Sequence, residues 1–540
     1  MKRKYLYILP AVAMLTAACE PNIEDKIDSG TYYAGEANFS SYVAIGNSLT
    51  AGFMDGTVYR SGQQNSFPNI LAGQFRVVGG GEFTQPSYAD DINDVGGLLF
   101  GGAYDGEKFP TKLIVNMAPG ADGQPQGPQV INKISTIEVT KLQAKAYHNA
   151  GVPGAKTFHL LAQGYGNAAN LAAGKANPYF VRTATSPNAT VLEDAMSLKP
   201  TFFTNWIGAN DVLAYATSGG EGVDQNELGG LNPAAYGGND ITHAGVFKQV
   251  YEGIIATLTS QGAKGVVATI PDVTAIPFFT TVPYNPLSPQ VIGVDNIDQL
   301  NMFVGMLKQV LTMAGEGDRL QLFSKEKANP LLIQDKTLKD MGPVLTAAIK
   351  GLVASGQFPL PITDAEIAFI GKTYGQARHA TAKDLMLLKS KSQIGLPIKT
   401  GNAAMDAMLK KGVTYPIEDA YVLNPVEQAK VKEATVKFNG IIRAVAAEKG
   451  LAVADMNAIL NQAVAGLRVE DGQIYTADYF KGMGNLNTVM FSLDGVHLNA
   501  RGYAFISSEI LKVINKHFKA NIPLVNPAVY PGPTLLAGNK

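Results

Sequence analysis

Cysteine and tryptophan are nearly absent from this chain, which has one Cys and one Trp among 540 residues. A single cysteine excludes an intramolecular disulfide, so stability must come from a packed core. Runs of positive charge are also missing after residue 4, and the formal net charge is -1. This charge balance lacks the basic field that binds nucleic acid phosphates, and we expect no nucleic acid partner.

The apolar stretch at the N-terminus is too short to span a membrane. Leu6 to Ala18 covers thirteen residues after a basic segment at 2–4, and Pro10 interrupts it. About 20 apolar residues are needed to cross a bilayer as a helix. The segment 1–18 is instead typical of a signal peptide that is removed on export.

The sole cysteine stands at the end of this segment. Thr16-Ala17-Ala18-Cys19 resembles a bacterial lipobox, in which the cysteine thiol receives a diacylglyceryl group. The resemblance implies a lipoprotein that is exported and lipid-anchored through Cys19 to the bacterial cell envelope, at the outer membrane or cell surface. An incidental signal-peptide cysteine is the alternative. Residues 19–38 are polar and are predicted to form a tether.

Hydrophobic residues make up 46% and charged residues 16% of the chain, as in globular rather than disordered proteins. Short β-branched or aromatic runs alternate with helical stretches, which predicts an α/β fold with a parallel sheet. The predicted strands are Tyr42–Ile45, Ala144–His148, Thr201–Trp206, Gly265–Ile270 and Leu451–Ala454. The predicted helices include Val246–Leu258, Pro425–Lys449 and Arg501–Lys516.

Two long intervals interrupt this alternation, and we interpret them as insertions. The first, 53–145, is rich in glycine and turn residues. The second, 281–421, has apolar residues at helical spacing over Asn301–Ala314 and Pro343–Ser355. A helical lid over an active site and a stabilising subdomain are equally compatible with this pattern. The main domain is therefore expected at 39–280 and 422–520, followed by an extended tail at 521–540.

A serine follows the first predicted strand. Ala44-Ile45-Gly46-Asn47-Ser48 places Ser48 where a parallel strand passes into a helix. Reactive groups collect at this edge of α/β sheets. A helix N-terminus at that point leaves the Ser48 amide free to donate a hydrogen bond to an oxyanion.

An acid and an imidazole lie close together near the other end of the chain. Asp494 precedes His497 by three residues, ahead of the amphipathic helix that begins near Arg501. Such a turn can hold the carboxylate against Nδ1 of the imidazole while Nε2 faces a serine. Taken alone, this pair is more often a solvent-exposed loop than a catalytic pair.

Four separated blocks together resemble the GDSL, or SGNH, family of hydrolases. In the family's order they are Gly46-Asn47-Ser48-Leu49, Asn149-Ala150-Gly151-Val152-Pro153-Gly154-Ala155, Gly208-Ala209-Asn210-Asp211 and Asp494-Gly495-Val496-His497. Asn47 stands where the family's name motif has Asp. The resemblance implies a three-layer α/β/α, flavodoxin-like fold, whose five parallel strands lie in the order 2-1-3-4-5.

The same resemblance assigns roles to the matched residues. It implies a catalytic triad with Ser48 as nucleophile, His497 as general base and acid, and Asp494 as its orienting partner. The Ser48 and Gly154 amides and the Asn210 side-chain amide would form the oxyanion hole. The expected reaction is hydrolysis of a carboxylic ester by a lipase or esterase, through an acyl-serine intermediate and without a metal or organic cofactor.

The substrate stays open between a lipid ester and an acylated glycan, and the helical insertion favours a longer acyl chain. Within the enzyme class, a carbohydrate O-acetyl esterase is an alternative. Outside that class, the alternative is a non-catalytic, surface glycan-binding lipoprotein. Capture proteins of that kind usually present several exposed aromatics, whereas the sole tryptophan, Trp206, is predicted to be a core residue.

Three further patterns have structural interpretations. Gly164-Tyr165-Gly166-Asn167-Ala168-Ala169 has the spacing of a dinucleotide-binding turn, but no acidic residue follows about 20 positions later. Asp90, Asp91 and Asp94 lack the register of a calcium loop, which favours a solvated loop. The remaining histidines show no metal-ligand spacing. They are His148, His159, His243, His379 and His517.

Overall fold

The computed structural model describes residues 31–119, 125–358, 362–465, 467–468, 474–475 and 488–535. The predicted signal peptide and Cys19 lie outside these residues. Within them, no helix is both long enough and apolar enough to cross a membrane.

The centre of the molecule is a five-stranded parallel sheet with the strand order β13-β8-β7-β1-β6. Its strands are β1 (Tyr42–Gly46), β6 (Asn149–Gly151), β7 (Phe202–Trp206), β8 (Lys264–Ala268) and β13 (Ala452–Ala454). Counted along the chain, this order is 2-1-3-4-5, with every neighbouring pair parallel. The predicted α/β class and strand order are therefore confirmed.

The second predicted strand was misplaced. The segment Ala144–His148 is not a strand, and β6 follows it at Asn149–Gly151, inside the glycine block. Ala144 has a φ of 47°, a left-handed conformation that interrupts an extended chain. The strand is only three residues long, so it offers too little alternation for sequence patterning to locate it.

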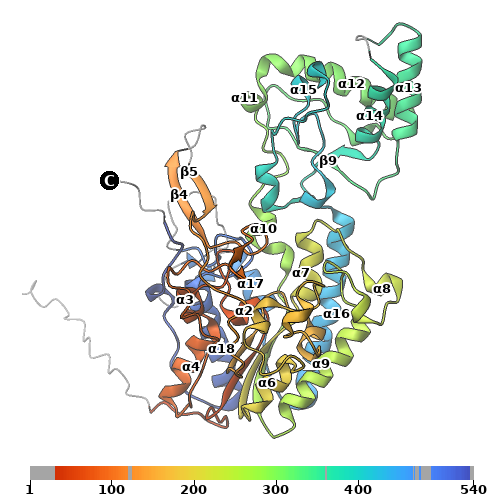
Figure 1. Ribbon diagram of the computed structural model, residues 1–540. Coiled ribbons are helices and arrows are strands. Elements are labelled where there is room, and N and C mark those ends of the chain that lie inside the picture. Colours follow the sequence, from red (N-terminus) through yellow and green to blue (C-terminus); the bar gives the residue numbers. More distant parts are fainter. Residues whose placement is uncertain are drawn as a thin grey trace, which may run out of the picture.

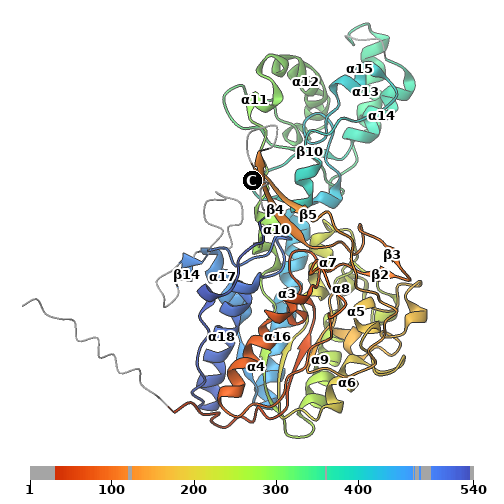
Figure 2. The same cartoon turned by 60° about the vertical axis from the view of Figure 1, so that its left-hand side comes forward.

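Helices cover both faces of the sheet and make it a three-layer structure (Figure 1). α4 (Phe67–Val77) and α18 (Ala500–Phe518) lie side by side on one face, as Figure 2 also shows. α9 (Ala244–Thr259) and α16 (Pro425–Lys449) pack together on the other face. All five residues of β1 are buried, as expected for a central parallel strand covered on both sides.

The interval 53–145 is not wholly an insertion, because it contains α4, the crossover helix between β1 and β6. The helix buries Phe67, Leu71 and Phe75 in the main core. The rest of the interval contains the short helix α3 (Arg60–Gln64), irregular segments and two hairpins. These are β2 (Leu99–Phe100) with β3 (Ala103–Tyr104), and β4 (Leu113–Pro119) with β5 (Pro125–Val130).

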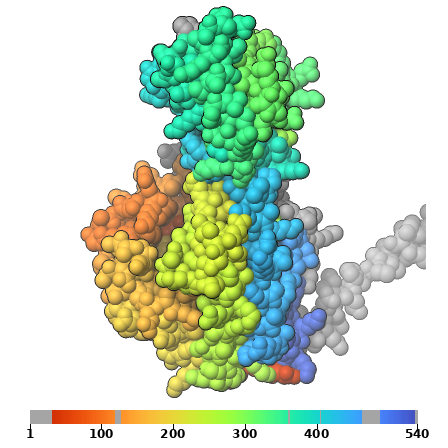
Figure 3. All heavy atoms as spheres, turned by 90° about the vertical axis from the view of Figure 1, so that its right-hand side faces the viewer, coloured from red at the N-terminus to blue at the C-terminus, as the bar shows by residue number. Residues whose placement is uncertain are grey.

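The interval 281–421 has a hydrophobic core of its own. A cluster of buried residues from Val282 to Val422 is separate from the core around the main sheet. Figure 3 shows the lobe set off from the rest of the molecule. Its helices are α11 (Pro289–Ile292), α12 (Ile297–Met313), α13 (Gly342–Ala354), α14 (Asp364–Tyr374) and α15 (Ala403–Met408). Two short antiparallel pairs complete it, β9 (Leu332–Gln334) with β10 (Ala377–His379), and β11 (Leu385–Met386) with β12 (Val422–Leu423).

The two ends of the described chain are fastened to the main domain. Tyr33 pairs with Asn521 through two backbone hydrogen bonds, and the Lys519 ammonium lies 2.7 Å from the Glu36 carboxylate. Residues 33–38, which we expected to belong to the tether, therefore pack with the main domain. The C-terminal tail is extended and bridges Val115 at Leu535.

Candidate active site

Ser48 lies at the carboxyl end of β1, on the first turn of α2 (Ser48–Ala51). Gly46 makes this turn possible, because a Cβ there would lie 2.6 Å from the Trp206 carbonyl oxygen on β7. The Asn47 side chain caps α2 by accepting a hydrogen bond from the Leu49 amide at 3.1 Å. A neutral amide supplies this cap as well as an aspartate would.

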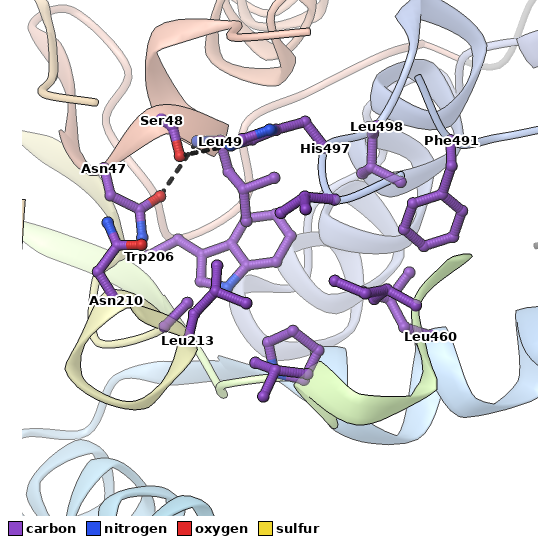
Figure 4. A pocket seen from close by; sticks show the side chains of 15 residues that line it. Asn47, Ser48, Leu49, Trp206, Asn210, Leu213, Leu460, Phe491, His497 and Leu498 are labelled. Atoms are coloured by element: carbon purple, nitrogen blue, oxygen red, sulfur yellow. Dashed lines mark hydrogen bonds between the residues drawn. The ribbon is translucent and has the colours of Figure 1, made fainter. Parts of the chain in front are cut away.

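Three side chains predicted from distant blocks meet at this point. The His497 Nε2 atom lies 2.8 Å from Ser48 Oγ, although the residues are 449 positions apart. The His497 Nδ1 atom lies 2.9 Å from Asp494 Oδ2. Ser48 faces His497 directly in Figure 4, and the dashed line between them marks the hydrogen bond. Both distances are within the range of good hydrogen bonds.

The Asp494 carboxylate is held ionised by its surroundings. Its Oδ1 atom accepts hydrogen bonds from the Val496 and His497 amides, both at 2.8 Å. Its Oδ2 atom also accepts from the Gly56 amide at 3.1 Å. Burial alone raises the pKa of Asp494, but the imidazole and these amides outweigh it and hold the pKa well below its ordinary value. A charged Asp494 accepts from Nδ1–H and so leaves Nε2 as an acceptor for the serine proton.

A second carboxylate, which the sequence did not reveal, supports the Asp494 turn. Asp55 Oδ1 accepts from the Leu493 amide at 2.9 Å, and Oδ2 accepts from the Tyr59 hydroxyl at 2.9 Å. The Asp55 amide in turn donates to Ser492 Oγ at 3.0 Å. Burial is the main cause that raises the pKa of Asp55 to about 6. The Met54-Asp55-Gly56 turn belongs to none of the four blocks, so no sequence signal pointed to it.

The predicted oxyanion donors are unequally placed. Asn210 lines the same cavity as Ser48, and its side-chain amide donates one hydrogen bond to the Ala155 carbonyl at 2.9 Å. The second hydrogen of that amide remains available. Within the described part of the chain, the Ser48 and Gly154 amides have no acceptor. Gly154 has a φ of 78° and lies exposed on the loop after β6.

Asp211 joins the two elements that supply these donors. Its buried Oδ2 atom accepts from the Thr157 amide at 2.9 Å and from the Thr157 hydroxyl at 2.8 Å. Asp211 follows Asn210 in α7 (Asn210–Thr217), and Thr157 lies three residues after Gly154. Burial raises the pKa of Asp211. The fourth residue of the Gly-x-Asn-Asp block therefore positions the loop that contains Gly154.

A small apolar cavity of about 40 Å³ opens beside Ser48. Trp206 forms one wall and is 1% exposed, so it is a core residue, as predicted, and also lines the cavity. The ring of Phe53 packs on the His497 imidazole with centroids 4.5 Å apart. None of the described residues that line the cavity comes from the insertion 281–421. In this structure the insertion is not a wall of the cavity.

The other patterns in the sequence have structural roles. The acidic cluster is not a solvated loop, because Asp91 is fully buried and accepts from three backbone amides. Asp90 pairs with Arg182, and Asp94 pairs with Lys112. Residues 164–169 follow a 3-10 helix rather than a strand, so the context of a dinucleotide site is missing. Among the described residues, no three His, Cys, Asp or Glu side chains form a metal-binding group.

Comparison with known proteins adds no further assignment. No protein-family model, curated protein or solved structure matches this chain.

Proposed function

We propose that this protein is a serine ester hydrolase of the SGNH type. The observation that supports the proposal is the continuous chain of hydrogen bonds from Ser48 through His497 to Asp494. An ordinary serine hydroxyl is a poor nucleophile and needs an adjacent base to remove its proton. The convergence of four sequence blocks at one edge of the sheet supports the family resemblance.

The first half of the reaction forms an acyl-enzyme. His497 Nε2 takes the proton of Ser48 Oγ as this oxygen attacks the ester carbonyl carbon. The carbonyl oxygen becomes an oxyanion that accepts from the Ser48 and Gly154 amides and from Asn210 Nδ2. The tetrahedral intermediate collapses, its C–O bond to the alcohol breaks, and the imidazolium gives its proton to the departing alcohol.

The second half of the reaction releases the acid. A water molecule gives a proton to His497 Nε2 and attacks the acyl carbon. Collapse of this second intermediate returns the proton to Ser48 Oγ and frees the carboxylic acid. Asp494 stays ionised throughout and stabilises the imidazolium in both halves, in keeping with its lowered pKa.

We place this activity on a lipid-anchored protein of the bacterial cell envelope. The basic N-terminal segment, the apolar stretch at 6–18 and Cys19 support export and lipidation. The first described residues pack at the end of the sheet opposite the Ser48 edge, beside the end of α18.

The direct test is labelling with a fluorophosphonate probe together with turnover of p-nitrophenyl acetate. Wild-type protein is expected to label and to turn over, while Ser48→Ala loses labelling and at least about 10,000-fold in kcat/KM. Ser260→Ala is the matched control, because Ser260 is exposed at the end of α9. Equal turnover in wild type and Ser48→Ala would favour the non-catalytic glycan-binding alternative.

A further inference from the structure

The cavity beside Ser48 is apolar at the end away from the serine. Figure 4 shows Ser48 and Asn210 at one end of the cavity and Leu460 and Phe491 at the other. Leu460 is 7% exposed and Phe491 2% exposed, so both belong to the buried core. A group that enters beside Ser48 therefore meets an apolar wall.

The cavity is narrow enough to limit what it can hold. A cavity of roughly 150 Å³ accommodates benzene, which corresponds to about 25 Å³ per carbon. The volume of about 40 Å³ beside Ser48 thus holds on the order of two carbons. An acyl group whose carbonyl carbon is bonded to Ser48 Oγ has room in this cavity for a short tail.

The lining also restricts the chemistry of the tail. Leu49, Leu213, Val273 and Ile276 contribute apolar side chains, and Trp206 contributes its ring. Among the described residues that line the cavity, none is Lys, Arg, Asp or Glu. A charged tail would lose its hydration here without gaining a partner, which is costly.

A narrow apolar cavity suits the acyl group better than the alcohol. The alcohol must leave after the first half of the reaction, and water must enter in its place. The acyl group stays bonded to Ser48 until the second half is complete, so it can remain in the narrow cavity during this exchange.

We propose that the cavity is an acyl-binding site selective for uncharged acyl groups of about two to four carbons. This inference rests on the proposed esterase function and names its substrate class. It differs from the expectation of a longer acyl chain, because the helical insertion that prompted that expectation does not line the cavity. Leu460 and Phe491 set the length limit.

The test is a series of p-nitrophenyl esters with acyl chains of two, four, eight and twelve carbons. We expect kcat/KM to fall at least about 30-fold between four and eight carbons, which is about 2 kcal/mol at 1.36 kcal/mol per tenfold. Equal or faster turnover of the eight- or twelve-carbon ester would overturn the inference. Failure to turn over any ester in a Ser48-dependent manner would instead overturn the proposed function.

Varying the alcohol shows whether the acyl group or the alcohol of the ester occupies the cavity. With acetate as the acyl group, ethyl and octyl esters are expected to differ less than about threefold in kcat/KM. A strong preference for the short alcohol, combined with indifference to acyl length, would place the alcohol in the cavity and refute the assignment.

Two truncations test the walls. Leu460→Ala removes side-chain volume at the end away from Ser48 and is expected to raise the eight- to four-carbon ratio of kcat/KM at least about tenfold. Leu213→Ala widens the cavity from α7 beside Asn210 and should also raise this ratio. It is safer for folding, because Leu213 is only half-buried. Leu258→Ala, a buried leucine of α9 away from the cavity, should leave the ratio unchanged. An unchanged ratio in folded Leu460→Ala and Leu213→Ala proteins would contradict the proposal.

Discussion

Replacing Asp494 by asparagine tests the proposed mechanism at Asp494 Oδ2, the atom that accepts the hydrogen bond from His497 Nδ1. Asparagine has nearly the same shape, and its carbonyl oxygen can keep the two hydrogen bonds that Oδ1 accepts from the Val496 and His497 amides. Its NH₂ group then occupies the position of Oδ2, which in the wild type accepts from His497 Nδ1 at 2.9 Å and from the Gly56 amide at 3.1 Å. The asparagine NH₂ group would there face two other hydrogen-bond donors, His497 Nδ1–H and the Gly56 amide.

The imidazole can relieve this conflict only by changing its tautomer. With Nδ1 as acceptor, the proton moves to Nε2, which then faces Ser48 Oγ at 2.8 Å as a donor and cannot take the serine proton. In triads of this kind the wrong tautomer costs about 10⁴-fold in kcat, or about 5.4 kcal/mol at 1.36 kcal/mol per tenfold. We therefore expect kcat/KM for p-nitrophenyl acetate to fall by about that factor in Asp494→Asn.

Two controls make this experiment decisive. Asp298→Asn changes an exposed carboxylate of α12 and should retain full activity. Adding Asp494→Asn to Ser48→Ala should cause little further loss, since triad members act as a unit. A drop of less than about tenfold in folded Asp494→Asn, or a large additional drop in the double variant, would refute the assigned role of this carboxylate.

Three further outcomes are expected. Asn210→Ala should lower kcat by about 100- to 1,000-fold with little change in KM, because it removes one oxyanion donor. Steady-state kinetics would measure both parameters. A change in KM alone would count against the proposed role of Asn210. Burial raises the pKa of Asp55 to about 6, above the ordinary aspartate value of 3.8. The contribution of Asp55 to stability is therefore present below about pH 4 and is lost as the pH rises through 6. Relative to Asp55→Asn, wild type should thus lose about 2 to 3 kcal/mol of unfolding free energy between about pH 4 and pH 7 in urea titrations, and a constant difference would disprove the effect. Cys19→Ser should move the protein from the detergent phase to the aqueous phase in Triton X-114 partitioning, whereas unchanged partitioning would argue against lipidation at this residue.

Local patterning predicted the long elements well and the short ones poorly. α16 has the bounds Pro425–Lys449 that its apolar periodicity and flanking residues indicated, since Asn424 caps it and Gly450 ends it. β6 was missed by five residues because a three-residue strand is defined by its neighbour β1 rather than by its own alternation. The crossover helix α4 was assigned to an insertion because glycine-rich segments follow it closely.

The residues of the candidate site also divide into those that the sequence predicted and those that only the structure revealed. The serine, the histidine and the aspartate could be named from the sequence, because a motif places particular atoms at a particular strand end or turn. Asp55 could not be named, because its importance comes from hydrogen bonds to residues 437 and 438 positions away. Asp211 was within a recognised block, but its link to Thr157 became visible only in three dimensions.

The sequence by itself determined the α/β class and the residue types available for nucleophilic chemistry, since these depend on local periodicity and short spacings. The strand order was implied by the resemblance of the four blocks to a known family. The tertiary structure alone decided the 2.8 Å approach of His497 to Ser48, the buried support of Asp494 and the volume of the neighbouring cavity. These features arise when helices and loops from distant parts of the chain pack against one sheet edge, and no local pattern records how closely they fit.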